Sequence, residues 1–170
     1  MDLQFTDTER LILANQYEIL AKLDKDNSYA LLAKQLRDGH EWLYRQSFSW
    51  VSPVMPESDA EFVLTIVGLY SDLLFSFNEL ADKGELTASQ VQFPGFDGND
   101  SRECELMGFA RALIEAGRFS ETLDGRTDLN SHYPAVPGYK KMIKRWIELG
   151  SPRELTKEQI TAVLGAKRAD

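Results

Sequence analysis

The sequence predicts an all-α protein: a single compact domain of about seven helices around a long apolar central helix (about 58–82), with two long loops (about 83–100 and 118–138). Apolar residues recur every three or four positions over most of the chain, which is the period of an amphipathic helix. Several of these stretches follow a Ser or Thr with Glu or Gln three positions later, a helix-start signature. The length of 170 residues and the 43% apolar content are typical of one globular domain. We therefore expect one domain over 1–170.

The first two helices are predicted from caps and spacing. Thr6 and Glu9 form a capping box, and an apolar stripe follows until the pattern breaks at 24–26. Ser28 is expected to cap a second helix, and Gly39 to end it, since glycine adopts the left-handed conformation at helix C-termini. The inward residues of the first helix are predicted to be Leu13, Tyr17 and Leu20.

Residues 40–56 are rich in aromatic rings and end in two prolines. We interpret them as a short helix followed by an aromatic connector. Two roles are open for the rings of this connector. They can pack in the core, which we favour, or form an oligomer contact, where aromatic side chains are over-represented. The rings are those of Trp42, Tyr44, Phe48 and Trp50.

The most hydrophobic stretch runs over 62–77, after the helix-start signature at 58–61. Glu61, Asp72 and Glu79 interrupt it, so its longest uncharged run is shorter than the ~20 residues of a bilayer span. We expect the central helix of a core and no membrane segment. The N-terminus lacks the pattern of a signal peptide, and the single cysteine, Cys104, fits a reducing compartment. These observations predict a cytoplasmic protein.

Three helices are predicted in the second half of the chain. They cover about Ser101–Ala116, Tyr139–Leu149 and Thr156–Leu164, and the last begins with a capping box of Thr156 and Gln159. We expect a turn over 97–101, with Asn99, Asp100 or Ser101 capping the helix that follows.

Several spaced motifs resemble those of the YfbU-like family, whose members are uncharacterised bacterial proteins. The first helix carries Arg-Leu-Ile-Leu at 10–13 and Asn-Gln-Tyr at 15–17. Gly-Phe-Asp stands at 95–97, Gly-Phe-x-Arg at 108–111 and Gly-Arg-Phe at 117–119. Family-like spacings also hold for Asn130, Pro134, Tyr139, Met142, Trp146 and the segment 155–160. The resemblance implies one YfbU-like helical domain and assigns no reaction. Ala60, Thr65 and Gly68 stand where the family can show a cysteine and two acidic residues, so no function of those groups is carried over.

The motifs of common catalytic and cofactor sites are absent from the sequence. His40, His132 and Cys104 lack zinc-type spacing, and a calcium-loop reading of 97–108 fails because Arg102 and Gly108 occupy the required Gly and Glu positions. Nucleophile elbows, P-loops and dinucleotide fingerprints are missing as well. We assign no catalytic residue, metal or cofactor. Whether the protein is an enzyme stays open, and the sequence favours that it is not.

Three arginines of the family-like motifs form a candidate ligand site. The guanidinium group suits carboxylates and phosphates, so an anion-binding pocket is predicted if these arginines converge near Asp97 and Tyr139. The alternative, which we favour, is that each arginine pairs internally with a carboxylate and ties the loops to the helices. The arginines are Arg10, Arg111 and Arg118.

Charge is unevenly distributed along the chain. The net charge of −8 combines eight basic and four acidic residues from Gly138 onward with 11 basic and 23 acidic residues before it. The helix at 139–149 therefore presents a candidate interaction face, made of Lys140, Lys141, Lys144 and Arg145. This face is either simply solvated, or it docks an acidic protein, including a second copy of the chain. We do not expect nucleic acid as a partner, because the rest of the surface would repel phosphate.

These observations together predict a non-enzymatic helical interaction or regulatory protein that self-associates, as a homodimer or other homo-oligomer. One alternative is an enzyme or small-anion-binding protein that uses the Arg/Asp pocket. Another is weak nucleic-acid binding through the basic face of the helix at 139–149.

Overall fold

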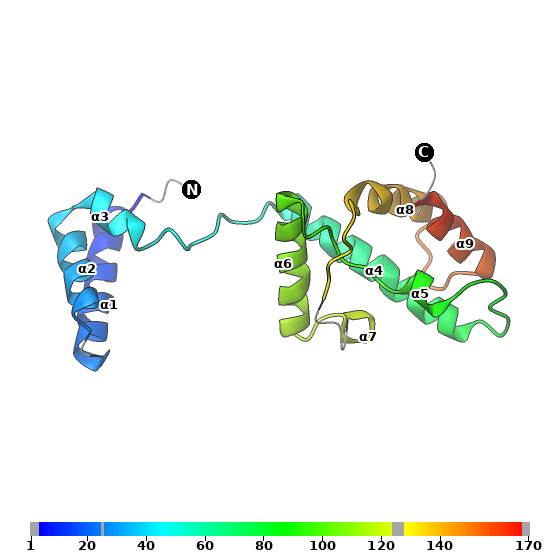
Figure 1. Cartoon of the computed structure of the whole chain (residues 1–170), viewed down its shortest axis with the longest axis horizontal. Coiled ribbons are helices and arrows are strands. Elements are labelled where there is room, and N and C mark those ends of the chain that lie inside the picture. Colours follow the sequence, from blue (N-terminus) through cyan, green and yellow to red (C-terminus); the bar gives the residue numbers. More distant parts are fainter. Residues whose placement is uncertain (1–3, 25, 124–127, 168–170) are drawn as a thin grey trace. The chain divides into compact units, whose positions relative to one another are not determined.

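The computed structural model describes residues 4–24, 26–123 and 128–167, and it confirms the all-α class. These residues contain nine helices and no strand (Figure 1). Where the sequence predicted one compact domain, the chain divides into two compact units, 1–54 (unit 1) and 55–170 (unit 2). The segment before the boundary contains Pro53 and is exposed from Trp50 to Val54, so it adds nothing to either core.

Unit 1 is a helical hairpin with a short third helix. Its helices are α1 (Asp7–Asp24), α2 (Asn27–Asp38) and α3 (Glu41–Gln46). The helices α1 and α2 pack against each other, and they share a small core with two aromatic side chains that follow. The buried members of this core are Ala14, Leu32, Leu36, Tyr44 and Phe48.

The ends of these helices follow local hydrogen bonding. The Thr6 amide donates to Glu9 (2.8 Å) and the Glu9 amide to the Thr6 hydroxyl (3.2 Å), which confirms the predicted capping box. Gly39 ends α2 in the left-handed conformation, as predicted. The prediction that Ser28 caps α2 is wrong: the cap is Asp26, whose carboxylate accepts from the Ser28 amide at 2.8 Å. This bond lowers the pKa of Asp26.

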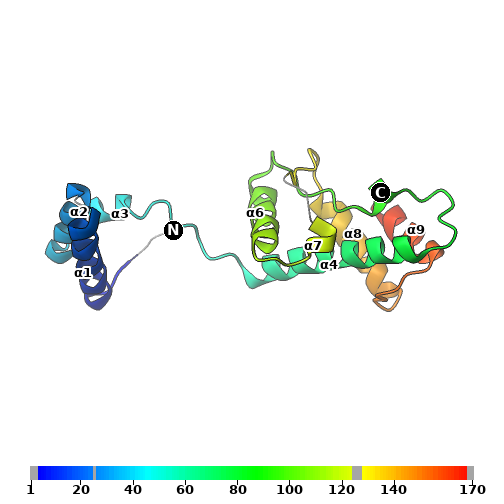
Figure 2. The same cartoon turned by 90° about the horizontal axis from the view of Figure 1, so that it is seen from below.

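Unit 2 is built around α4 (Glu57–Glu79), the predicted central helix. Eight residues of α4 are buried, and α4 contacts the five other helices of the unit. Figures 1 and 2 show α6 crossing the first half of α4 steeply. The expected capping box at 58–61 is wrong, because the helix already starts at Glu57, after Pro56. Proline fixes its own backbone and thereby sets the start of the helix.

By length and composition, α4 is apolar enough to cross a membrane. It also forms the centre of the buried cluster of unit 2, with Val63, Ile66, Val67 and Leu73 fully buried. Core burial therefore accounts for its apolar character, since a core helix passes the same test of length and composition.

Each of the two predicted loops contains one helical turn, which explains why the sequence predicted fewer helices. These turns are α5 (Ala88–Val91) and α7 (Ser120–Leu123). Thr87 and Gln90 form a capping box around α5. Residues 124–127 of the second loop lie outside the described part of the chain.

The remaining helices are α6 (Ser101–Glu115), α8 (Val136–Glu148) and α9 (Lys157–Ala166). Asp100 caps α6 and Thr156 caps α9, as the sequence predicted. The helix α8 begins three residues earlier than expected. Pro137 lies in its first turn, where the missing amide hydrogen of proline is tolerated.

Gly95 and Gly108 give a matched test of this fold. Gly95 has a φ of +93°, and an added Cβ would lie 1.8 Å from the carbonyl oxygen of Leu129. We expect Gly95→Ala to lower the free energy of unfolding by at least about 2 kcal/mol, because both the backbone conformation and the close approach exclude a side chain.

The control is Gly108→Ala in the middle of α6, where nothing lies within 4 Å of an added Cβ. We expect it to stabilise the protein by about 0.5–1 kcal/mol, because alanine is the better helix former. Urea denaturation followed by circular dichroism measures both changes. Equal stabilities of the two variants would contradict this account of Gly95.

Candidate functional site

A buried glutamate connects three segments of unit 2. Glu103, in the first turn of α6, is 6% exposed. Its carboxylate accepts hydrogen bonds from the backbone amides of Asp97 (2.8 Å), Ala135 (3.1 Å) and Val136 (3.1 Å). Amide donors around a carboxylate stabilise its charge where water is excluded. Glu103 therefore holds the loop before α6 and the start of α8 on the first turn of α6.

The family-like motif residues surround this glutamate. The side chain of Asn130 accepts from the amides of Gly98 and His132, both at 2.9 Å. Phe96 pairs with the segment of Asn130 in an isolated bridge. The Tyr139 hydroxyl donates to the carbonyl oxygen of Gly95. We call this set of loop contacts around Glu103 the glutamate clamp.

An aromatic cluster lies beneath the glutamate clamp. The Tyr139 ring stacks on Phe93 at a centroid distance of 5.7 Å, and it meets Phe96 and Tyr70 edge to face at 5.7 and 5.9 Å. All four side chains are at most 1% exposed. Stacked and edge-to-face rings are the favoured packing of aromatic groups. Tyr139, a predicted ligand-binding residue, thus lies in the core.

Asp97, another predicted ligand-binding residue, is 7% exposed. Its carboxylate accepts from the backbone amide and the side-chain amide of Asn99, both at 2.9 Å. Such bonds stabilise a turn after an aspartate, so these contacts give Asp97 a structural role. Within the described residues, no group of three or more His, Cys, Asp or Glu side chains lies together as a metal site would require.

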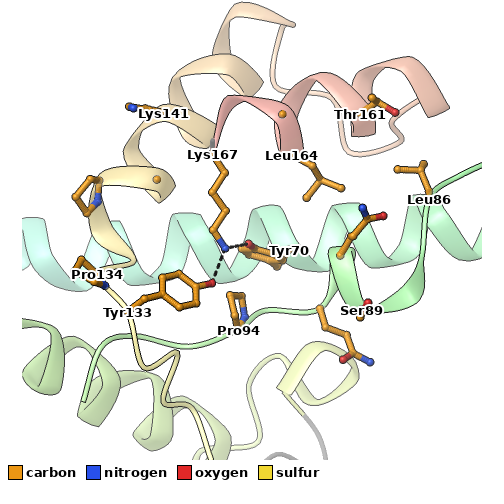
Figure 3. A pocket seen from close by; sticks show the side chains of 15 residues that line it. Tyr70, Leu86, Ser89, Pro94, Tyr133, Pro134, Lys141, Thr161, Leu164 and Lys167 are labelled. Carbon is orange, nitrogen blue, oxygen red and sulfur yellow. Dashed lines mark hydrogen bonds between the residues drawn. The ribbon is translucent and has the colours of Figure 1, made fainter. Parts of the chain in front are cut away.

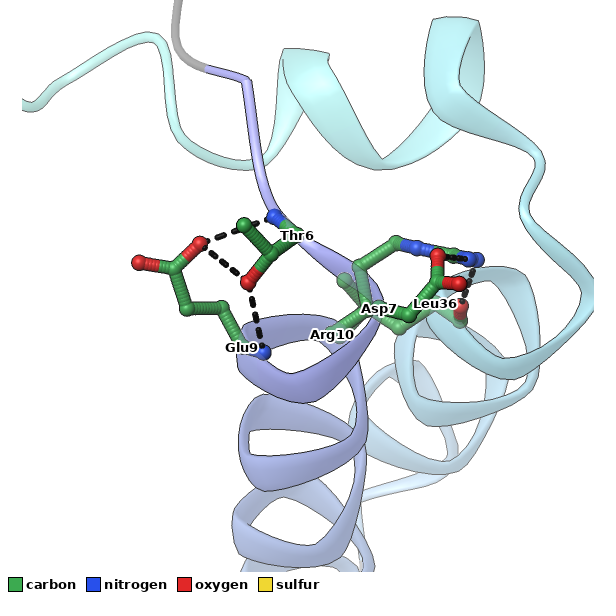
Figure 4. Close-up of polar contacts among 5 residues, drawn as sticks. All are labelled: Thr6, Asp7, Glu9, Arg10 and Leu36. Atoms are coloured by element: carbon green, nitrogen blue, oxygen red, sulfur yellow. Dashed lines mark hydrogen bonds and ion pairs between the residues drawn. The ribbon is translucent and has the colours of Figure 1, made fainter.

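The structure does not bring the three motif arginines into one unit. Arg10 belongs to unit 1, where it donates to the carbonyl oxygen of Leu36 (3.0 Å) and pairs with Asp7 (2.5 Å) (Figure 4). This pairing raises the pKa of Arg10. Arg111 and Arg118 lie in unit 2 and are exposed, and neither has an ion pair within the described residues. The Arg/Asp anion pocket stays a prediction without a contact that supports it.

The predicted basic face on α8 has an apolar hollow beside it. Lys140 and Lys144 flank a hollow of about 340 Å³, and Arg145 pairs with Glu148 at 3.2 Å. Lys141 also lies on α8 and is exposed. The apolar residues of the hollow are Phe62, Ile143 and Ile147, of which Ile147 is 58% exposed. This face therefore combines cationic and apolar groups.

Unit 1 carries most of the exposed apolar side chains. Of the fourteen large hydrophobic residues that are exposed in the described chain, eleven belong to unit 1. Three of them, Ile12, Ile19 and Leu23, are 51%, 58% and 71% exposed and are seven and four positions apart on α1. Residues at this spacing share one helix face. Because the buried Ala14 belongs to a different face, α1 has a second apolar stripe that the described residues of unit 1 leave exposed.

The four rings of the aromatic connector divide into two buried and two exposed ones. Tyr44 and Phe48 are buried in unit 1 at 3% and 8% exposure, whereas Trp42 and Trp50 are 75% and 76% exposed. Leu20, expected on the inward side of α1, is 36% exposed. The two tryptophans therefore belong to the exposed surface of unit 1 and not to its core.

Comparison with known proteins identifies the family. The YfbU domain model matches residues 3–166. The chain belongs to the YfbU family. A UPF0304 protein of Methanocaldococcus jannaschii is 34% identical over 93% of this chain and 97% of its own length. A UPF0304 protein of Mannheimia succiniciproducens is 31% identical over 96% of this chain and all of its own. The names of these YfbU relatives state no reaction, ligand or partner.

Two features that the structure shows, the role of Glu103 and the second apolar stripe of α1, are not among the predictions from the sequence. The role of Glu103 is not predictable from the sequence, because its partners are backbone amides that lie six and more than thirty positions away. The second stripe of α1 did leave a signal: Ile12, Ile19 and Leu23 repeat at helical spacing beside the inward stripe. A helix with two apolar stripes predicts two packing partners.

The glutamate clamp is tested by Glu103→Gln. A glutamine places an amide nitrogen, itself a donor, against backbone amides that need an acceptor. We expect a loss of about 2 kcal/mol in the free energy of unfolding, since a buried donor without a partner costs that much.

The control for this variant is Glu105→Gln, an exposed glutamate of the same helix, where we expect a change within about 0.5 kcal/mol. Thermal and urea unfolding measure both. Equal effects of the two variants would show that the carboxylate of Glu103 holds nothing together.

Proposed function

We propose that this YfbU-family protein is a helical interaction protein, without a catalytic role, that self-associates through the apolar surface of unit 1. The observation that carries the proposal is the second stripe of α1, Ile12–Ile19–Leu23, exposed together with Trp42 and Trp50. Exposed apolar surfaces of this kind mark interaction sites.

Unit 1 exposes a large apolar area, distributed over α1, α2, α3 and the segment that follows α3. Two tryptophans are about three-quarters exposed, and six aliphatic side chains of unit 1 are more than half exposed. Together they present on the order of 1,000 Å² of residue surface, against about 800 Å² per partner in a standard interface. The aliphatic residues are Leu11, Ile12, Ile19, Leu23, Leu31 and Val54.

The small core of unit 1 supports the same proposal. Five buried hydrophobic side chains form its core cluster, which is little for a unit of 54 residues. Units near this size are marginal alone and are commonly stabilised by association. Covering the stripe of α1 would add the apolar burial that the unit lacks.

A second copy of the chain is the partner that this surface suits best. The positions of the stripe are apolar, and Gln16, between Ile12 and Ile19 in the same row, is uncharged. Two such stripes can pack together without bringing like charges into contact, although each chain has a net charge of −8. Two-fold symmetric dimers, in which one surface meets its own copy, are the commonest homo-oligomers.

The other functions predicted from sequence have weaker support. The hollow between Lys140 and Lys144 would suit an acidic partner with an apolar side chain, but it offers less area than the exposed apolar side chains of unit 1, and the acidic Glu148 also lines it. Neither the Arg/Asp pocket nor a nucleic-acid interface has a contact in the described residues that favours it. A cytoplasmic location remains the expectation from sequence.

The proposal predicts that the full chain is a dimer, with twice its mass of 19.3 kDa, at tens of micromolar. Ile19→Glu and Leu23→Glu each place a charge in the proposed interface, where it would be buried without a partner. We expect each variant to weaken self-association at least about a hundredfold and to be monomeric. Light scattering coupled to size-exclusion chromatography measures the masses.

The matched control is Phe75→Glu, which changes an apolar residue on α4 of unit 2 whose exposure, 51%, is close to the 58% of Ile19. This variant should remain dimeric. A monomeric wild-type chain would overturn the proposal, and so would a dimer that Ile19→Glu leaves intact.

A further inference from the structure

Residues of unit 2 line a cavity of about 710 Å³, and none of these residues belongs to the surface proposed for self-association. It is bounded by α5 with the residues on either side of it, by α9, by the first half of α8 with the residues before it, and by Tyr70 of α4 (Figure 3). Its volume is in the range of cavities that hold small ligands. Neither the glutamate clamp nor the proposed dimer gives this cavity a role.

The charge of the cavity is opposite to that of the protein. The chain has 27 acidic residues and a net charge of −8, yet none of the fifteen described residues that line the cavity is acidic. Two lysines, Lys141 and Lys167, are among these lining residues. In such a protein, a recess with lysines and without carboxylates is selective for anions over cations.

The ammonium group of Lys167 is held among aromatic side chains. It donates to the hydroxyls of Tyr133 (3.0 Å) and Tyr70 (3.5 Å), and lies 5.3 Å from the ring centroids of Tyr133 and Tyr139. Figure 3 shows its side chain reaching from the end of α9 toward the two hydroxyls. Within the described part of the chain, no carboxylate pairs with Lys167. Its charge therefore remains available to a ligand.

The hydroxyl groups around Lys167 have defined roles. Tyr70 is 1% exposed and directs its own proton to the sulfur of Met142 (3.7 Å). Burial raises the pKa of Tyr70, so this phenol stays neutral. Tyr133 is 42% exposed. Because Tyr133 accepts its bond from Lys167, its own O–H proton points elsewhere and can be donated to an acceptor in the cavity.

The rest of the lining is suited to an organic ligand with a partly apolar body. Three prolines and two leucines contribute apolar surface, while Ser89, Thr161 and two glutamines contribute short polar groups. Such a combination, an apolar wall with a few polar anchors, is typical of small-molecule sites. The apolar residues are Pro94, Pro134, Pro137, Leu86 and Leu164.

We infer that this cavity binds a small organic anion, a carboxylate or phosphate ester with an apolar or aromatic body, whose charged group is held by Lys167 and Tyr133. The ammonium supplies a charge-assisted hydrogen bond and the Tyr133 hydroxyl a second donor. The walls between α5 and α9 cover the apolar body. This inference does not depend on self-association.

The test uses four probes on the full chain: benzoate, phenyl phosphate, inorganic phosphate and the neutral benzyl alcohol. Nuclear magnetic resonance titration follows the Lys167 side chain and the rings of Tyr70 and Tyr133. We expect benzoate or phenyl phosphate to bind at least tenfold more tightly than benzyl alcohol. Comparison of the two anions separates carboxylate from phosphate ligands, and inorganic phosphate shows what the apolar body contributes.

Two cavity variants and one control complete the test. Lys167→Met should weaken binding of the preferred anion at least tenfold, and Tyr133→Phe should weaken it severalfold. Lys34→Met, which removes an exposed lysine of unit 1, should leave it unchanged. Circular dichroism confirms that each variant is folded.

The inference is overturned if benzyl alcohol binds as tightly as the anions, or if folded Lys167→Met binds them as the wild type does. It is also overturned if none of the probes shifts the signals of Lys167, Tyr70 or Tyr133 at concentrations up to 10 mM.

Discussion

Unit 2 depends on one buried carboxylate. Glu103 accepts hydrogen bonds from backbone amides of the loop before α6 and of the start of α8, and it thereby fixes this loop and the point at which α8 begins. Its removal would leave buried amide donors without acceptors, which is costlier than never burying them. The position of Tyr139 in the aromatic cluster, and the positions of Pro137 and Gly138 in the wall of the cavity, follow from where α8 starts.

The two units use their apolar residues differently. In unit 2, α4 contacts five other helices, and its buried apolar residues form the centre of one large core cluster. Unit 1 has only two long helices, and α1 has apolar residues on two faces while α2 covers one. The proposed function follows from this difference. The motif residues of unit 2 stabilise its fold, whereas self-association is proposed for unit 1.

The sequence predicts local features well and long-range ones poorly. The caps at Thr6, Asp100 and Thr156 were predictable because each involves residues within three positions. The central helix was predictable from its apolar run. The clamp was not, because Ala135 lies 32 positions from Glu103. The anion site predicted from Arg10, Arg111 and Arg118 failed to gain support for the same reason: a motif shows that residues matter without showing what they contact. Lys167 belongs to no motif and is found only through the cavity.

Hydrogen–deuterium exchange of the full chain, at concentrations below and above the midpoint of association, tests the central claim most directly. The account predicts that amides of α1 gain protection as the concentration rises, because the Ile12–Ile19–Leu23 face becomes covered. The amides of Asp97, Ala135 and Val136, bound to Glu103, should be protected at both concentrations. Exchange of α1 that is independent of concentration, or rapid exchange of the three clamped amides, would contradict it.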